Sequence, residues 1–260
     1  MDNLLYKIVD EYKALPEVKA IAIGGSSTAK TSDDKSDIDI YVFTDKGISL
    51  EIRNQIVQKY STKYEVGGEY FGSGDEYFVD DLGQQFDVMY WDINWFNSIV
   101  ENVWEKCYPS NGYTTCFLYT LNNFNIVYDT DNWLLVLKDK LKKDYPEQLQ
   151  KNIIQRNIML MKDKPFASYY EQIEKALYRS DLNSVNHRVS AFLASYFDVI
   201  FAINKLLHPG EKRLLGYAKK HCKILPNDFE INVLKLLEQP NEKTLQILDK
   251  IIENLRLIIT

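Results

Sequence analysis

The spacing of hydrophobic residues changes near residue 146 of this 260-residue chain. Before that point, short apolar runs alternate with glycine-rich and polar stretches, which is typical of strands joined by turns. After it, apolar residues recur every three or four positions, which is typical of helices that pack together. We therefore predict an α+β protein. Residues 1–145 form a domain with a mixed sheet flanked by helices, and residues 146–260 form an all-α helical bundle.

Within the first domain, the pattern predicts a helix over residues 4–12 and a strand over 18–23. Ser49 is a good N-cap for a following helix that buries one apolar face. A helix over 93–104 is expected to bury Trp95, and the tryptophans at 91, 95 and 104 are expected in the core. Further strands are predicted at 37–44, 64–70, 86–91 and 125–129, and a further helix at 133–143.

Glycines and acids gather between residues 67 and 81. Glycine clusters are typical of irregular backbone, so we interpret this stretch as a flexible acidic loop that could attract a cationic ligand. An ordinary surface hairpin is the alternative. The residues in question are Gly67, Gly68, Gly72, Gly74, Asp75, Glu76, Asp80 and Asp81.

The stretch 21–43 carries the clearest chemical pattern: a strand, a glycine turn, a polar loop and a second strand. Because strand side chains alternate between faces, Asp37 and Asp39 leave the same side while Ile38 and Ile40 face a core. Two close carboxylates repel each other, so the arrangement favours a divalent cation with oxygen ligands. The glycine turn at 24–26 lets backbone amides approach a phosphate group.

This combination resembles the signature of the nucleotidyltransferase superfamily to which DNA polymerase beta belongs. The resemblance implies a third carboxylate on a later strand, and Asp87, within Phe86-Asp87-Val88-Met89, is the best candidate. It also implies that Asp37, Asp39 and Asp87 are catalytic and hold two Mg²⁺ ions, while Gly24, Gly25 and Ser26 bind the nucleotide phosphates. The expected reaction moves a nucleoside monophosphate, with ATP as the expected donor, to a hydroxyl and releases pyrophosphate.

Residues 186–212 are similar to the second domain of antibiotic nucleotidyltransferases, which act on aminoglycosides or lincosamides. The resemblance implies that Lys212 reaches the triphosphate, whereas the alternative is a lysine in the first turn of an exposed helix. It also makes a small-molecule hydroxyl the expected acceptor, with antibiotic resistance as one role. The proton could be taken by Asp87, Glu171 or Glu174, and the sequence does not choose among them.

Composition limits the kinds of partner and cofactor that the chain is expected to bind. The net charge of −6 disfavours a protein that holds nucleic acid through many phosphate contacts. The three cysteines lack the spacing of a zinc site or a disulfide framework. The three histidines show no ligand spacing and are expected to be structural. No apolar run approaches the ~20 residues of a membrane span, and the acidic first residues do not resemble a secretory signal. We expect a cytoplasmic protein that makes no membrane contact.

Two other functions remain open at this stage. The same chemistry could act on a protein or a tRNA end, although the lack of a basic patch counts against tRNA. Alternatively, the chain could be a nucleotide-binding protein that has lost turnover. The presence of all three acids and the Gly-Ser turn favours an active enzyme.

Overall fold

The computed structural model describes residues 2–24, 37–70, 72–238 and 243–259. The chain forms two compact units, one of residues 1–101 and 120–143, the other of residues 102–119 and 144–260. The predicted α+β class is confirmed, because one unit carries a mixed sheet and the other is helical. The predicted domain boundary after residue 145 stays a prediction. Segment 102–119, which precedes that boundary, packs with the helical unit.

The first unit is built on a six-stranded sheet with the order β3-β4-β5-β2-β1-β6. Strands β2 and β5 are parallel, and the other neighbouring pairs are antiparallel. The strands are β1 (Val18–Gly24), β2 (Ile38–Thr44), β3 (Lys63–Gly68), β4 (Gly74–Val79), β5 (Gln84–Asp92) and β6 (Asn125–Asp129). The helices are α1 (Asp2–Lys13), α2 (Leu50–Val57), α3 (Ile93–Val100), α4 (Cys116–Asn123), which ends in this unit, and α5 (Trp133–Lys140).

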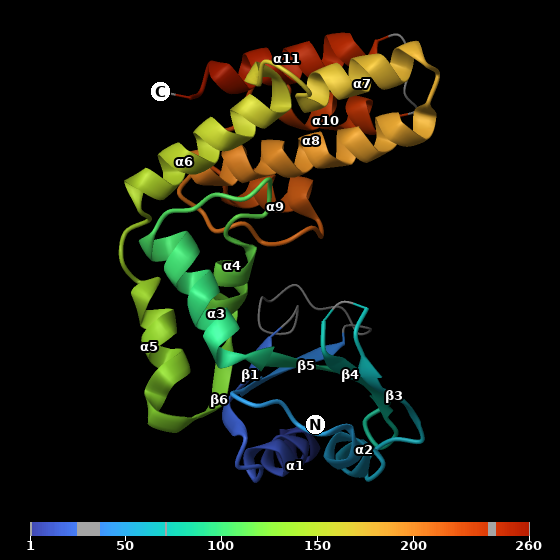
Figure 1. Ribbon diagram of the computed structural model, residues 1–260, viewed down its shortest axis with the longest axis vertical. Coiled ribbons are helices and arrows are strands. Elements are labelled where there is room, and N and C mark those ends of the chain that lie inside the picture. The colour runs from blue at the N-terminus through green and yellow to red at the C-terminus, as the bar shows by residue number, and fades with distance from the viewer. Residues whose placement is uncertain (1, 25–36, 71, 239–242, 260) are drawn as a thin grey trace. The chain divides into compact units, whose positions relative to one another are not determined.

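Helices α1 and α2 cover one face of this sheet (Figure 1). Ile8 and Tyr12 of α1 and Val57 of α2 pack with Ile40 and Val88 of the central strands in one buried cluster. Helix α2 begins where predicted, because the Ser49 hydroxyl accepts a hydrogen bond from the amide of Ile52. The apolar side of the alternating strand pattern is therefore the side that α1 and α2 cover.

The opposite face of the sheet has two parts. At one end, a group of rings that we call the aromatic cluster packs against strands β2 and β5. Centroid separations within it include 4.7 Å for Tyr41 and Trp91 and 5.3 Å for Phe43 and Phe96. Phe124 and Trp133 complete the cluster. The other end of the same face carries the acids described below.

The interpretation of residues 67–81 as a flexible acidic loop is wrong. Residues 74–79 form β4, and Asp75 is only 1% exposed. Its carboxylate accepts hydrogen bonds from Arg53 Nε at 3.0 Å and from the Tyr90 hydroxyl at 2.6 Å, and the Gly67 amide donates to it at 2.9 Å. A buried carboxylate that is fully hydrogen-bonded can stand in a core position, so this acid belongs to the inner face of the strand.

The helix predicted over 93–104 is also modified. It begins as α3, capped by Asp92, and continues as a π-helical turn, Glu101–Glu105. Trp104 is buried as expected, but the prediction that Trp95 is buried is wrong, since 39% of that residue is exposed. Its amide binds the Asp92 cap in the first helical turn, and the neighbouring Phe96 takes the inward position instead.

The second unit packs around the long helix α8 (Leu182–Ile203), whose residues Phe192, Tyr196 and Ile200 are buried. Neither this helix nor any other in the described ranges is long and apolar enough to cross a membrane. None of the three cysteines, all of which lie in the described ranges, forms a disulfide. The remaining helices are α6 (Glu147–Ile158), the π-helix Met159–Asp163, α7 (Tyr169–Tyr178), α9 (Leu214–His221), α10 (Phe229–Leu237) and α11 (Thr244–Arg256).

Candidate functional site

Asp39 and Asp87 lie directly opposite each other on the paired parallel strands β2 and β5. Residues in register on neighbouring strands point to the same face, so both carboxylates leave the sheet on the side away from α1 and α2. Both residues are half-buried. Gln85 Nε2 donates a hydrogen bond to Asp87 Oδ1 at 2.9 Å. Asp37 comes one residue before β2 and is exposed.

Two further acids, which the sequence analysis did not single out as site residues, extend this pair. Asp87 is in register with Glu76 of β4, and Glu76 is in register with Glu65 of β3. Asp39, Asp87, Glu76 and Glu65 thus form one line across four neighbouring strands, which we call the acid row. The signal for Glu76 was available in the sequence, because Asp75, Tyr77 and Val79 alternate with it and face inward.

The acids of the row influence one another electrostatically. Partial burial raises the pKa of Glu76, and the charges of Asp87, Glu65 and Asp37 raise it further. Like charges at short range make ionisation of each carboxyl harder. This shift also shows that Asp37 lies within electrostatic range of the row, although it is outside the strand. Concentrated negative charge of this kind favours the approach of cations.

Gly24 and Tyr41 shape the start of the site. Gly24 is in register with Asp39, and the ring of Tyr41 lies over it, 2.5 Å from where a Cβ at Gly24 would stand. Position 24 therefore requires a glycine, because the Tyr41 ring approaches its backbone too closely for a side chain. Burial, followed by the charges of Asp39 and Asp87, raises the pKa of the Tyr41 hydroxyl well above its ordinary value. Tyr41 joins the acids to the aromatic cluster.

The roles predicted for Gly25, Ser26 and Lys212 stay predictions. Gly25 and Ser26 lie outside the described residues. Lys212 is exposed and belongs to the second unit, in the loop before α9. Of the two helical candidates for proton acceptor, Glu171 receives a hydrogen bond from the Ala167 amide at 2.7 Å in the first turn of α7, which is a structural role.

A divalent cation fits the donor chemistry of Asp39, Asp87 and Asp37, since hard ions such as Mg²⁺ prefer carboxylate oxygens. Within the described ranges, no three His, Cys, Asp or Glu side chains are already arranged to hold a metal ion. The registered pair Asp39 and Asp87 is the best-defined part of the predicted metal site, and the role of Asp37 in it stays a prediction.

No protein-family model matches the chain, and no curated protein sequence does. Among solved structures, the chain is similar to a nucleotidyltransferase-like protein from Exiguobacterium sibiricum, with 13% identity and a TM-score of 0.48 over 99% of this chain and 74% of that one. It is also similar to a STING-associated c-di-GMP synthase from Capnocytophaga granulosa, with 13% identity and a TM-score of 0.29 over 99% and 78% of the two chains.

A further match is a CCA-adding enzyme solved in complex with ATP, with 12% identity and a TM-score of 0.29 over 90% of this chain and 68% of that one. With identities of 12–13% and TM-scores below 0.5, these similarities assign no function to the chain.

Proposed function

We propose that this chain transfers a nucleoside monophosphate, AMP from ATP in the first instance, to a hydroxyl of a small molecule with release of pyrophosphate. The observation that carries the proposal is the registered pair Asp39 and Asp87 on β2 and β5, with Asp37 one residue before β2 and Gly24 beside Asp39. The spacing of Asp37 and Asp39 after a glycine turn supports the same chemistry from the sequence side.

Each residue has a stated role in this proposal. Asp37, Asp39 and Asp87 would hold Mg²⁺, and Gly24, Gly25 and Ser26 would bind the nucleotide phosphates through the turn that follows β1. When bound, Mg²⁺ would lower the pKa of the acceptor hydroxyl and neutralise the leaving pyrophosphate. Asp87 stands next to Glu76 in the acid row, so a carboxylate is at hand for the proton of the acceptor. Lys212 would contribute a charge to the triphosphate.

The acid row favours a cationic acceptor. Glu76 and Glu65 continue the line of negative charge beyond the pair that would hold the metal, and a groove of one sign concentrates ligands of the other sign. An aminoglycoside, which carries several ammonium groups and hydroxyls, combines both requirements. We therefore place aminoglycosides ahead of lincosamides as acceptors, and antibiotic resistance is the corresponding role.

The test is a thermal denaturation series with ATP, GTP, CTP and UTP, each with and without Mg²⁺. A ligand that binds only the native state stabilises it by about 2.7 kcal/mol when present at 100 times its Kd. We expect a Mg²⁺-dependent rise in Tm with ATP that Asp39→Asn abolishes. Asp81→Asn, an exposed acid outside the row, is the matched control and should keep the rise.

Turnover is then measured as pyrophosphate release with kanamycin and with lincomycin as acceptors. Asp39→Asn should lower the rate by about 100-fold or more, because it weakens binding of the Mg²⁺ that would stabilise negative charge at the transferring phosphoryl group. A Tm rise that survives Asp39→Asn, or that does not need Mg²⁺, would contradict the metal-bridged site. Nucleotide binding without release for either acceptor would move the function to a protein or tRNA acceptor, or to nucleotide binding alone.

A further inference from the structure

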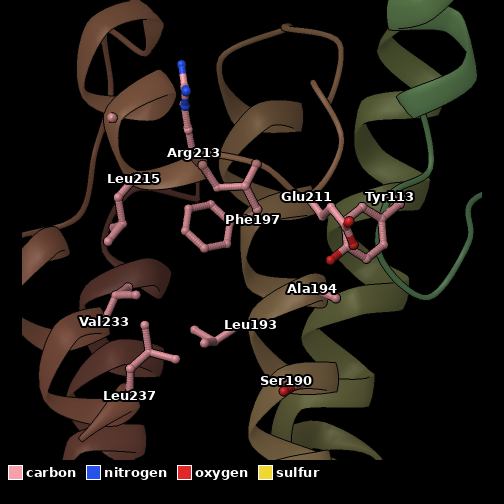
Figure 2. Close-up of a pocket in the computed structure, with 12 residues that line it drawn as sticks. Tyr113, Ser190, Leu193, Ala194, Phe197, Glu211, Arg213, Leu215, Val233 and Leu237 are labelled. Carbon is pink, nitrogen blue, oxygen red and sulfur yellow. The ribbon is translucent and has the colours of Figure 1, made fainter. Parts of the chain in front are cut away.

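A cavity of about 400 Å³ lies within the second unit, between α8, the start of α9 and α10. Figure 2 shows side chains from these three helices directed toward a common space. Small-molecule sites are commonly ~300–1,000 Å³ and mostly apolar, with a few polar groups at fixed places. The apolar residues that line this cavity are Leu193, Ala194, Phe197, Leu214, Leu215, Val233 and Leu237.

One carboxylate, the exposed side chain of Glu211, lies at the edge of this cavity. Glu211 lies beside Tyr113 (Figure 2). Burial of the Tyr113 hydroxyl is the largest cause that raises its pKa, and the charge of Glu211 is the second. Among the described residues, Glu211 forms no ion pair. Arg213 also lines the cavity, but its guanidinium points away from the apolar side chains (Figure 2). The polar character of the cavity edge is therefore set by Glu211, together with the hydroxyls of Ser190 and Tyr113.

Gly216 marks open space in the same wall. It lines the cavity from within α9, and a Cβ added there would meet nothing within 4 Å. A glycine inside a helix is less favourable than alanine by about 1 kcal/mol. Its backbone conformation is open to other residues, because its φ is not positive. Gly216 is exposed, so a larger side chain can be placed beside the cavity here without a steric or backbone penalty.

We propose that this cavity is a binding site for a small aromatic or alicyclic amine, whose apolar body occupies the space between α8, α9 and α10 and whose ammonium group pairs with Glu211. Each residue that lines the site belongs to the second unit, and none belongs to the acid row. An ammonium group pairs with the exposed carboxylate of Glu211 at the edge of the cavity, and the apolar lining supplies most of the affinity.

The test measures binding of 1-naphthylmethylamine by isothermal titration calorimetry, with 1-naphthylacetate as the probe of opposite charge. We expect saturable binding of the amine and at least about 10-fold weaker binding of the acetate. Glu211→Gln should weaken amine binding by about 10-fold and bring the two probes closer together. Gly216→Trp should abolish amine binding, because the indole ring would block the cavity from its exposed wall.

Two controls separate occupation of the cavity from unfolding. Lys220→Trp places the same side chain on an exposed position of α9 that does not line the cavity, and it should bind the amine as the wild type does. The Tm of Gly216→Trp should be at or above that of the wild type. Binding that persists in Gly216→Trp, equal affinity for the two probes, or no saturation at millimolar concentrations would overturn the proposal.

Discussion

At the scale of single residues, the site depends on one close approach. Tyr41 follows Asp39 by two residues on β2, so its ring leaves the same face, and it packs against Trp91 and Phe124 at 4.7 Å from the latter. These contacts leave the Tyr41 ring buried, and the ring covers Gly24. The glycine of the motif therefore has a packing reason in addition to any contact with a ligand.

We expect Gly24→Ala to destabilise the protein by about 1–3 kcal/mol, the usual cost of overpacking a well-filled site. The new Cβ would stand 2.5 Å from Tyr41 Cε2, so Tyr41 and the neighbouring Asp39 must shift. Gly68→Ala in β3 is the matched control, because a Cβ there meets its nearest atoms at 3.7 Å. Urea denaturation checks both, and equal midpoints for the two variants would contradict the argument.

At the scale of elements, the sequence predicted β2 and β5, which carry Asp39 and Asp87. It did not predict β4, which lies between β5 and the edge strand β3. In each strand the acid stands between two apolar residues, Ile38 and Ile40 in β2 or Phe86 and Val88 in β5, and this local pattern placed Asp39 and Asp87 correctly on strands. β4 was misread because Asp75 occupies an inward position of the alternation. Its partner Arg53 lies 22 residues away, and local periodicity contains no information about such a pairing. Because β4 was not recognised as a strand, Glu76 was not identified as a site residue.

The Arg53 and Asp75 pair should be a major determinant of the stability of β4 and α2. Arg53 is 4% exposed and Asp75 1%, so Arg53→Ala leaves a buried carboxylate without its cation. Removing one partner of a buried pair costs about 3–5 kcal/mol. Lys59→Ala removes the exposed pair with Glu11 and should cost less than about 1 kcal/mol. If the two variants had the same denaturant midpoint, the buried pair would contribute no more to stability than the exposed pair.

At the scale of the whole molecule, the least predictable feature is the packing of segment 102–119 with the helical unit. The Thr114 amide and hydroxyl donate to the carboxylate of Asp198, 84 residues later, at 3.0 and 2.6 Å, and Asn157 Nδ2 donates to it at 3.2 Å. Asp198 stands within an apolar helix, and the sequence does not indicate which residues donate hydrogen bonds to its carboxylate. The same unit holds His208 fully buried, with its amide bonded to the Thr115 hydroxyl.

These two buried groups should oppose each other in the pH dependence of folding. Burial raises the pKa of Asp198 to about 6, against the hydrogen bonds from Thr114 and Asn157, and burial lowers the pKa of His208 to about 4. The Asp198 contribution to stability is full below pH ~4 and is lost as the pH rises to ~6. The His208 contribution is full above pH ~6.5 and is lost as the pH falls to ~4. Each amounts to about 3 kcal/mol.

In the wild type these contributions largely cancel between pH ~4 and ~6.5, and removal of either group should expose the other. Over that range, we expect Asp198→Asn to lose about 3 kcal/mol more stability on acidification than the wild type, and His208→Gln about 3 kcal/mol less. Urea denaturation followed by helical circular dichroism at several pH values measures both. Because the other carboxyl groups titrate in all three proteins, their effects cancel in the comparison. Parallel pH profiles for the three proteins would mean that Asp198 and His208 titrate alike in the folded and unfolded chain.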